Sequence, residues 1–257
     1  MNFSVCIDAL YYGKNIPIAI QLEEVSQVGF KTIEFWSWWD KDIESIINNC
    51  KKFNLEIAGF CTPFVSLVDY DKHDDYLKGL KKTCEIAKRM GTRKIISQVG
   101  NTLLGTSRET QVENLINGLK KADNILKENQ MILVIEPLNV RVDHEGYFLD
   151  SSDEAVMICK TLASENIKIL FDIYHQQISE GDITRRIKEH KKFIGHFHAA
   201  DNPGRGRPGK GELNYEYLFK LIENEFDSSV IGLEYFTRHD SASSLSAFIE
   251  QFGETFK

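Results

Sequence analysis

Two histidines separated by one residue stand at the end of the apolar run Phe193–His198. Residues at i and i+2 of a strand point to the same face, so we expect His196 and His198 to face one way. Asp201 and a basic, glycine-rich loop that carries Arg205 follow directly. This combination indicates a ligand or metal site. The alternative is one buried, hydrogen-bonded histidine beside a second that has no functional role.

Acidic residues elsewhere favour the metal site. Glu136, Asp172, His198 and Glu234 each end one of the last four expected strands, about one strand–helix repeat apart. In a barrel of such repeats the carboxyl ends of the strands meet at one rim, where the active sites of these folds lie. Three carboxylates held together would repel each other without a cation. Together with one imidazole, they suit Mn²⁺ or Mg²⁺ better than a structural zinc ion.

The elements that must position these residues alternate along the chain. Short apolar runs predict strands at 3–8, 32–36, 56–61, 94–99, 131–137, 167–172, 193–198 and 230–235. Amphipathic runs predict helices at 18–28, 41–53, 71–90, 107–129, 152–162, 182–190, 215–226 and 241–252. Eight strand-then-helix units without a linker predict an α/β fold, a single (β/α)8 TIM barrel that spans residues 1–257. An open doubly wound sheet is the rival and would have fewer strands at this length.

Composition limits the classes of protein. The 257 residues carry a net charge of −7, which argues against nucleic acid as the main partner. The first residues lack a basic region and Asp8 interrupts their apolar run, so we expect no signal peptide. No apolar run is long enough to span a membrane. The five cysteines are an odd number, and no two of them form a Cys-x-x-Cys pair. We therefore expect reduced thiols and a cytoplasmic protein.

Polar residues after the strands could bind a small-molecule substrate. Asn139 and His175 each lie three residues beyond an expected ligand, and Arg205 could bind a substrate carboxylate. An ordinary solvated loop is the alternative for the Arg205 segment. Trp36 and its neighbours at positions 38 and 39 could line a pocket, pack internally, or form the interface of a homo-oligomer.

Five stretches together resemble a known family. They are Gly29–Trp36, Glu136–Asn139, Phe171–His175, Asp201–Tyr215 and Gly232–Tyr235. On these stretches the chain resembles the hydroxypyruvate isomerase-like group within the xylose isomerase-like TIM barrels. The loop after the seventh strand is the most specific of them.

The resemblance implies one divalent metal ion held by Glu136, Asp172, His198 and Glu234, with Glu136 and Glu234 also acting as the acid/base pair. Two positions depart from a simple match. Hydroxypyruvate isomerases usually have Gln where this chain has His198, whereas the related ketose 3-epimerases have His. Those epimerases also carry a further Glu where this chain has Val142.

The resulting hypothesis is an intramolecular oxidoreductase of carbohydrate metabolism, an isomerase of the aldose–ketose type. It would interconvert a small α-hydroxy carbonyl compound, a hydroxypyruvate-type oxo-acid, through an enediolate. The main alternative is a ketose 3-epimerase that acts on free sugars. DNA-repair endonucleases of the same barrel superfamily would need more histidines and a basic groove. A barrel that only binds sugar would not need the pair Glu136 and Glu234.

Overall fold

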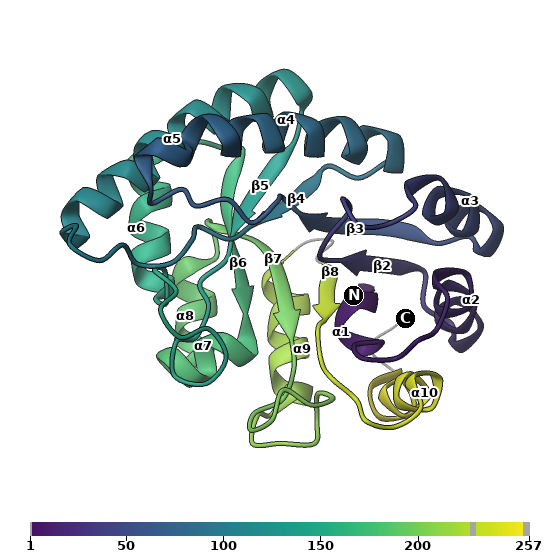
Figure 1. Cartoon of the computed structure of the whole chain (residues 1–257). Coiled ribbons are helices and arrows are strands. Elements are labelled where there is room, and N and C mark those ends of the chain that lie inside the picture. The colour runs from purple at the N-terminus through teal and green to yellow at the C-terminus, as the bar shows by residue number, and fades with distance from the viewer. Residues whose placement is uncertain (1, 227–229, 254–257) are drawn as a thin grey trace. The chain divides into compact units, whose positions relative to one another are not determined.

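The computed structural model describes residues 2–226 and 230–253. Its eight strands follow one another in the order β1 to β8 around a closed parallel barrel (Figure 1). They are β1 (Asn2–Cys6), β2 (Thr32–Phe35), β3 (Glu56–Cys61), β4 (Lys94–Ser97), β5 (Ile132–Ile135), β6 (Ile167–Asp172), β7 (Ile194–Ala199) and β8 (Val230–Leu233). The expected (β/α)8 fold is therefore confirmed.

Helices follow the strands, as the amphipathic runs predict. The longer ones are α2 (Ile18–Val28), α3 (Ile43–Phe53), α4 (His73–Met90), α5 (Arg108–Asn129), α6 (Ser152–Leu162), α8 (Ile183–His190), α9 (Tyr215–Glu225) and α10 (Ser241–Phe252). A 3-10 turn, η1 (Tyr70–Lys72), precedes α4. Two short helices were not expected from the sequence: α1 (Ile7–Leu10) and α7 (Ile173–Ser179). Both begin directly at the end of a strand, where an apolar run does not distinguish strand from helix.

Local capping explains several helix bounds. The Ser107 side chain accepts a hydrogen bond from the Thr110 N–H at the start of α5, and Asp42 does the same for α3. Gly29 and Gly91 end α2 and α4 in the left-handed conformation that glycine adopts without steric cost. The expected bounds of α2 and α6 are confirmed because such signals lie in the sequence itself.

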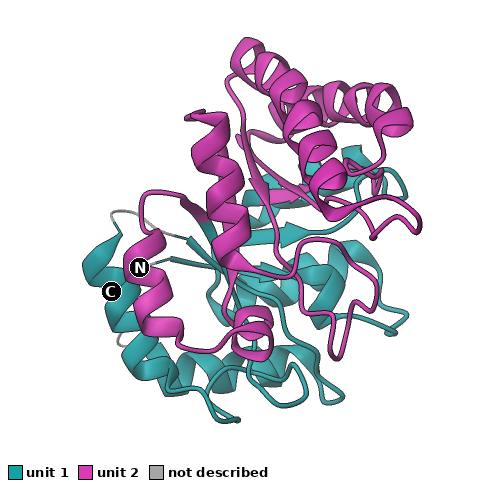
Figure 2. Cartoon of the chain, turned by 90° about the vertical axis from the view of Figure 1, so that its left-hand side faces the viewer, with its two compact units in different colours: residues 1–58, 196–257 teal, residues 59–195 magenta. Residues whose placement is uncertain are grey.

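The chain divides into two compact units, coloured separately in Figure 2. Unit 1 comprises residues 1–58 and 196–257, and unit 2 comprises residues 59–195. Each unit is described by itself below. The assignment of residues 1–257 to a single domain stays a prediction.

Unit 1 joins the first strands of the chain to the last. β1 pairs in parallel with β2 and with β8, and β8 pairs with β7. An aromatic cluster packs beneath α9 and α10, with Phe3 meeting the rings of Phe219 and Phe248 edge to face at 4.9 and 5.1 Å. Such pairs contribute roughly 0.5–1.5 kcal/mol beyond the area that they bury. The packing therefore holds β1, the strand that pairs with β8, against α9 and α10.

Unit 2 contains a run of consecutive parallel strands. β4 pairs with β3 and β5, and β5 pairs with β6. Leu133, Val134 and Ile135 of β5 are all fully buried. A strand buried on both faces is the usual state in a parallel sheet with helices outside it. The continuous apolar run at 131–135 thus accounts for the burial of β5, and Glu136 follows the end of this strand.

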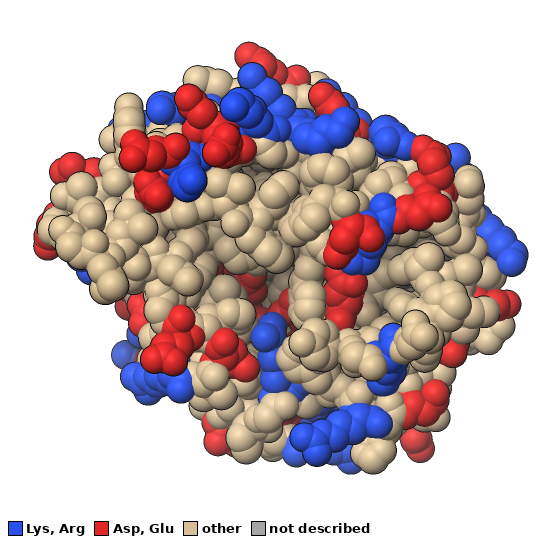
Figure 3. Space-filling model, viewed as in Figure 1, with Lys and Arg blue, Asp and Glu red and all other residues tan. Residues whose placement is uncertain are grey.

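Three features that the composition predicts can be compared with the structure, namely the surface charges, the helices and the cysteines. On the face in Figure 3, Lys and Arg side chains lie among Asp and Glu side chains. Within the described residues, no helix combines the length and the apolar character that crossing a membrane requires. All five cysteines are free thiols and buried.

Candidate active site

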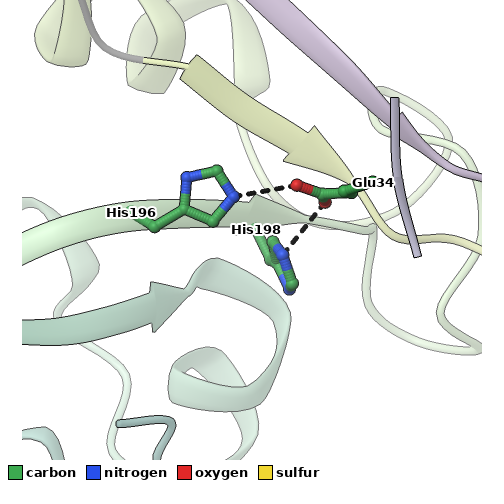
Figure 4. A group of neighbouring side chains, drawn as sticks. All are labelled: Glu34, His196 and His198. Atoms are coloured by element: carbon green, nitrogen blue, oxygen red, sulfur yellow. Dashed lines mark hydrogen bonds and ion pairs between the residues drawn. The ribbon is translucent and has the colours of Figure 1, made fainter. Parts of the chain in front are cut away.

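A buried carboxylate in unit 1 binds both histidines of β7 (Figure 4). Glu34, in β2, lies with Oε2 2.9 Å from His196 Nε2 and with Oε1 3.0 Å from His198 Nε2. All three side chains are at most 2% exposed. His196 and His198 do lie on one face, as the i, i+2 spacing predicts, and neither is solvent-exposed.

The surroundings of Glu34 keep its carboxylate charged and leave room for the histidines. Burial alone would raise the pKa of Glu34, but the imidazoles of His198 and His196 outweigh it and hold that pKa well below its usual range. The Ser4 hydroxyl also donates to Glu34 Oε2, at 3.0 Å. A Cβ atom on Gly232 would lie 1.9 Å from Glu34 Oε1 and 2.6 Å from His198 Cδ2. Only glycine at position 232 leaves room for this pair.

Glu234 follows β8 and is held by cationic and polar partners. Arg205 donates to Glu234 Oε2 in a short ion pair, and the Trp36 indole N–H donates to Oε1. His198 Nδ1 lies 3.4 Å from Glu234 Oε2. Burial raises the pKa of Glu234, but Arg205, His198 and Trp36 together lower it well below the ordinary value. The carboxylate is thus charged and fixed in position.

The loop after β7 is folded around one carboxylate. Asp201 Oδ2 accepts hydrogen bonds from the N–H groups of Gly209, Lys210 and Gly211, at 2.8–2.9 Å. A Cβ atom on Gly211 would lie 2.5 Å from Asp201 Oδ1, so the close approach of the backbone requires glycine. The loop expected to bind anions is therefore a compact turn that presents Arg205, which is only 8% exposed.

Aromatic rings stand beside Arg205 and Glu234. The Arg205 guanidinium lies over the Phe236 ring, 5.3 Å from its centroid, and Tyr12 meets the same ring at 5.4 Å. The ring centroid of Trp36 lies 6.3 Å from that of Tyr12 and 6.4 Å from that of Phe236. The sequence left open whether Trp36 lines a pocket, packs internally or forms an interface. In the structure its indole N–H bonds the Glu234 carboxylate. The neighbouring Trp39 is 41% exposed.

Unit 2 carries two further expected ligands. Glu136 and Asp172 are 4% and 0% exposed, and one carboxylate oxygen of each lies within 4.8 Å of the other. Asp172 Oδ1 accepts hydrogen bonds from the N–H groups of Tyr174 and His175 and so caps α7. Its other oxygen, Oδ2, lies 3.7 Å from His175 Nε2.

Asn139 and His175 form a fixed network in the same unit. Asn139 Oδ1 accepts from the N–H groups of Val142 and Asp143, at 3.0 and 3.2 Å, which identifies Nδ2 as the donor side of the amide. Nδ2 then donates to His175 Nδ1 at 2.7 Å and to Asp143 Oδ2 at 2.7 Å. With Nδ1 accepting, a neutral His175 carries its proton on Nε2, toward Asp172. Both Asn139 and His175 are fully buried, and their contact with substrate stays a prediction.

In unit 1, Glu34, His196 and His198 thus form a buried acidic–histidine group that could bind a metal ion. Sequence reasoning missed Glu34, Gly232 and Asp201 as organising residues. Glu34 lies one residue before the end of the strand β2, and this position near a strand end was the available signal.

Comparison with known proteins assigns the family. The model of the xylose isomerase-like TIM barrel family matches residues 22–252. Hydroxypyruvate isomerase from Escherichia coli strain K12 is 33% identical over 84% of this chain and 86% of its own length. 2-Oxo-tetronate isomerase from Cupriavidus necator is 33% identical over 66% of this chain and 65% of its own length.

Solved structures share the fold. The AP endonuclease, family 2, from Brucella melitensis is 26% identical, with a TM-score of 0.90 over 98% of both chains. D-Psicose 3-epimerase from Clostridium cellulolyticum H10 has a TM-score of 0.84 over 100% of both chains at 14% identity, which shows the fold alone.

The isomerase relatives match 84% and 66% of this chain and indicate an isomerase enzyme. The family model covers seven of the eight strands, β2 to β8, and with them Glu136, Asp172, His198 and Glu234. The chain therefore belongs to the xylose isomerase-like TIM barrel family, within its hydroxypyruvate isomerase-like group.

Proposed function

We propose that this protein is a metal-dependent isomerase of a small α-hydroxy oxo-acid of the hydroxypyruvate type. The observation that carries the proposal is the buried Arg205, paired with Glu234 beside His198. A guanidinium next to the proposed proton-transfer carboxylate can bind a substrate carboxylate through two parallel hydrogen bonds. The relatives that act on hydroxypyruvate and 2-oxo-tetronate, by their names, support this substrate class.

The donor set fits a hard divalent cation. In unit 2 two buried carboxylates approach within 4.8 Å, and in unit 1 His198 Nδ1 lies beside Glu234. We assign Glu136, Asp172, His198 and Glu234 as the residues that would hold Mn²⁺ or Mg²⁺, because carboxylate oxygens predominate. When bound, such an ion would polarise a carbonyl and an adjacent hydroxyl, which would acidify the neighbouring C–H and stabilise the enediolate.

The chain's own carboxylates move the protons. One of Glu136 and Glu234 removes the proton from the carbon beside the carbonyl, and the electron pair of that C–H bond passes into the enediolate. The other returns a proton to the adjacent carbon, so carbonyl and hydroxyl exchange places and no external oxidant is needed.

Three further residues are assigned to substrate. Arg205 would bind the carboxylate, His175 would steady the hydroxyl proton, and Asn139 would hold His175 in its Nε2–H form. The last part rests on the Asn139–His175 hydrogen bond of 2.7 Å. The cytoplasmic location, the oligomeric state and the identity of the ion stay predictions.

A ketose 3-epimerase is the second candidate, and His198 favours it. In that reaction the second carboxylate returns the proton to the opposite face of the same carbon. The epimerase of the same fold supports the possibility at the level of architecture alone. Arg205 argues for the oxo-acid, because a neutral sugar offers no charge for a buried guanidinium.

The deciding experiment compares substrates directly. We would incubate the protein and Mn²⁺ with hydroxypyruvate, 2-oxo-tetronate, D-psicose and L-ribulose in D₂O, remove the ion, and measure C–H exchange by NMR. We expect exchange and isomerisation of the oxo-acids, and none with the Glu136→Gln/Glu234→Gln double variant. Turnover of the ketoses without turnover of either oxo-acid would replace this proposal by the epimerase.

Metal binding has its own test. Asp172→Ala/His198→Ala should abolish stoichiometric binding of Mn²⁺ in equilibrium dialysis and remove the rise in Tm that bound ion gives the wild type. The matched control replaces an exposed aspartate and an exposed histidine, Asp71→Ala/His239→Ala, and should bind as the wild type does. Binding unchanged in the first variant would contradict the ligand assignment.

A further inference from the structure

Glu34 belongs to neither the expected ligands nor the proton-transfer pair, yet it lies at the centre of a buried polar group. Four adjacent strands of unit 1 contribute residues to this group. Glu34 of β2 pairs with Cys6 of β1. Gly232 of β8 pairs with Ser4 of β1 on one side and with His198 of β7 on the other. The cost of burying a carboxylate here calls for a function beyond packing.

The donors around Glu34 determine where protons reside. An ionised carboxylate only accepts hydrogen bonds. Its Oε1 faces His198 Nε2 at 3.0 Å, and its Oε2 faces His196 Nε2 at 2.9 Å and the Ser4 hydroxyl at 3.0 Å. A ring nitrogen without a hydrogen would set its lone pair against this charged carboxylate, so each Nε2 carries the hydrogen. The other ring nitrogen of His198, Nδ1, lies 3.4 Å from Oε2 of Glu234, an expected ligand of the same unit.

We infer that Glu34 is a positioning residue that holds His198 through Nε2–H and so presents Nδ1, rather than Nε2, to the cation. The inference rests on the proposed function in one respect, namely that His198 is a ligand. Histidine ligands generally donate their second N–H to a carboxylate or carbonyl, and loss of that partner typically costs about 10- to 100-fold in metal affinity.

Gly232 gives independent support. A Cβ atom at this position would overlap Glu34 Oε1, at 1.9 Å, and crowd His198 Cδ2, at 2.6 Å. The strand that carries Glu234 thus lacks a side chain at the point where the Glu34–His198 pair crosses it. An arrangement that served packing alone would fill this space with an apolar side chain.

The first measurement needs no variant. Long-range ¹⁵N–¹H NMR of histidine-labelled, metal-free protein reports which ring nitrogen of His198 is protonated, with assignment from the His196→Gln and His198→Gln spectra. We expect a protonated Nε2 that persists when Mg²⁺ is added. An unprotonated Nε2 would overturn the inference, whether or not the protein binds metal.

The second measurement compares two variants that each lose one hydrogen bond of the cluster. Glu34→Gln has one acceptor oxygen and an NH₂ group, so it cannot accept from both imidazoles. We expect its affinity for Mn²⁺ to fall about 10- to 100-fold in competition with a chelator, and the Nε2-protonated fraction of His198 to fall as well. His196→Gln keeps the Glu34–His198 pair and should retain wild-type affinity.

The outcomes separate the two proposals. Wild-type affinity in folded Glu34→Gln, or equal losses in both variants, would overturn the positioning role. If the wild type itself binds no Mn²⁺, the ligand assignment under the proposed function fails, while the NMR result still decides which nitrogen of His198 Glu34 holds.

Discussion

The two units hold their site residues by different means. In unit 2, Asp172 caps the helix that it begins, through N–H groups two and three residues away, and Asn139 bonds within its own loop. In unit 1, Glu34 reaches a histidine 162 residues away, and Trp36 reaches Glu234 across 198 residues. Asn139 also bonds His175, 36 residues away. These contacts of unit 2 therefore join residues nearer in the sequence than those of Glu34 and Trp36 in unit 1. Substitutions should expose this difference.

The largest effect tests whether both units supply a proton-transfer group. Glu136→Gln and Glu234→Gln each keep an oxygen donor but lose the basic carboxylate. We expect kcat for hydroxypyruvate to fall by on the order of 10²–10⁴ in each variant, measured on protein whose Mn²⁺ content equals that of the wild type. Near-wild-type turnover by metal-loaded Glu234→Gln would show that the two-carboxylate mechanism is wrong.

Arg205 tests whether unit 1 also sets the substrate class. A hydrogen bond to a charged group contributes roughly 1.5–3 kcal/mol, so Arg205→Ala should lower kcat/KM for hydroxypyruvate about 10- to 150-fold at 1.4 kcal/mol per decade. The Arg205–Glu234 pair is lost for every substrate, so a ketose serves as the reference. We expect a much smaller loss on the ketose. An equal fall in kcat/KM for both substrates would show that Arg205 acts only through its ion pair with Glu234.

Gly232 tests how much the free energy of unfolding depends on the close contacts around Glu34 in unit 1. Gly232→Ala forces a Cβ atom against Glu34 and His198, and overpacking of this kind costs about 1–3 kcal/mol of unfolding free energy. The control is Gly253→Ala in the same unit, whose Cβ would meet Ile249 at 3.6 Å, an ordinary contact. It should stay within about 0.5 kcal/mol of the wild type. Urea denaturation measures both, and equal stability of the two would show that the cluster tolerates the added Cβ.

The smallest effect is expected in the loop after β5. Asp143 accepts from Asn139 Nδ2 at 2.7 Å and from the Tyr174 hydroxyl at 2.9 Å, and it lies on an exposed stretch. Asp143→Ala should cost about 0.5 kcal/mol for each of the two hydrogen bonds removed, the low end of the usual range because this side chain is exposed. Val142→Ala is the exposed neighbour control. Thermal unfolding gives the result. A loss larger than that of Gly232→Ala would contradict the expected order of the two effects.

The sequence by itself determined the succession of strands and helices and the residues that end the strands. Alternating apolar and amphipathic runs predict the barrel, and Ser107 and Gly29 mark helix ends, because these signals act over a few residues. Glu136, Asp172, His198 and Glu234 could be named as candidates because their strand-end positions can be read from the same pattern.

Only the tertiary structure decided what those side chains contact. Arg205, expected to bind substrate, already pairs with Glu234, and His198 is held by Glu34 from a strand near the start of the chain. The sequence does not show that position 232 must lack a side chain for that pair to form. The physical reason is that strand register, set by core packing over long sequence separations, determines which side chains meet, and no local pattern encodes it.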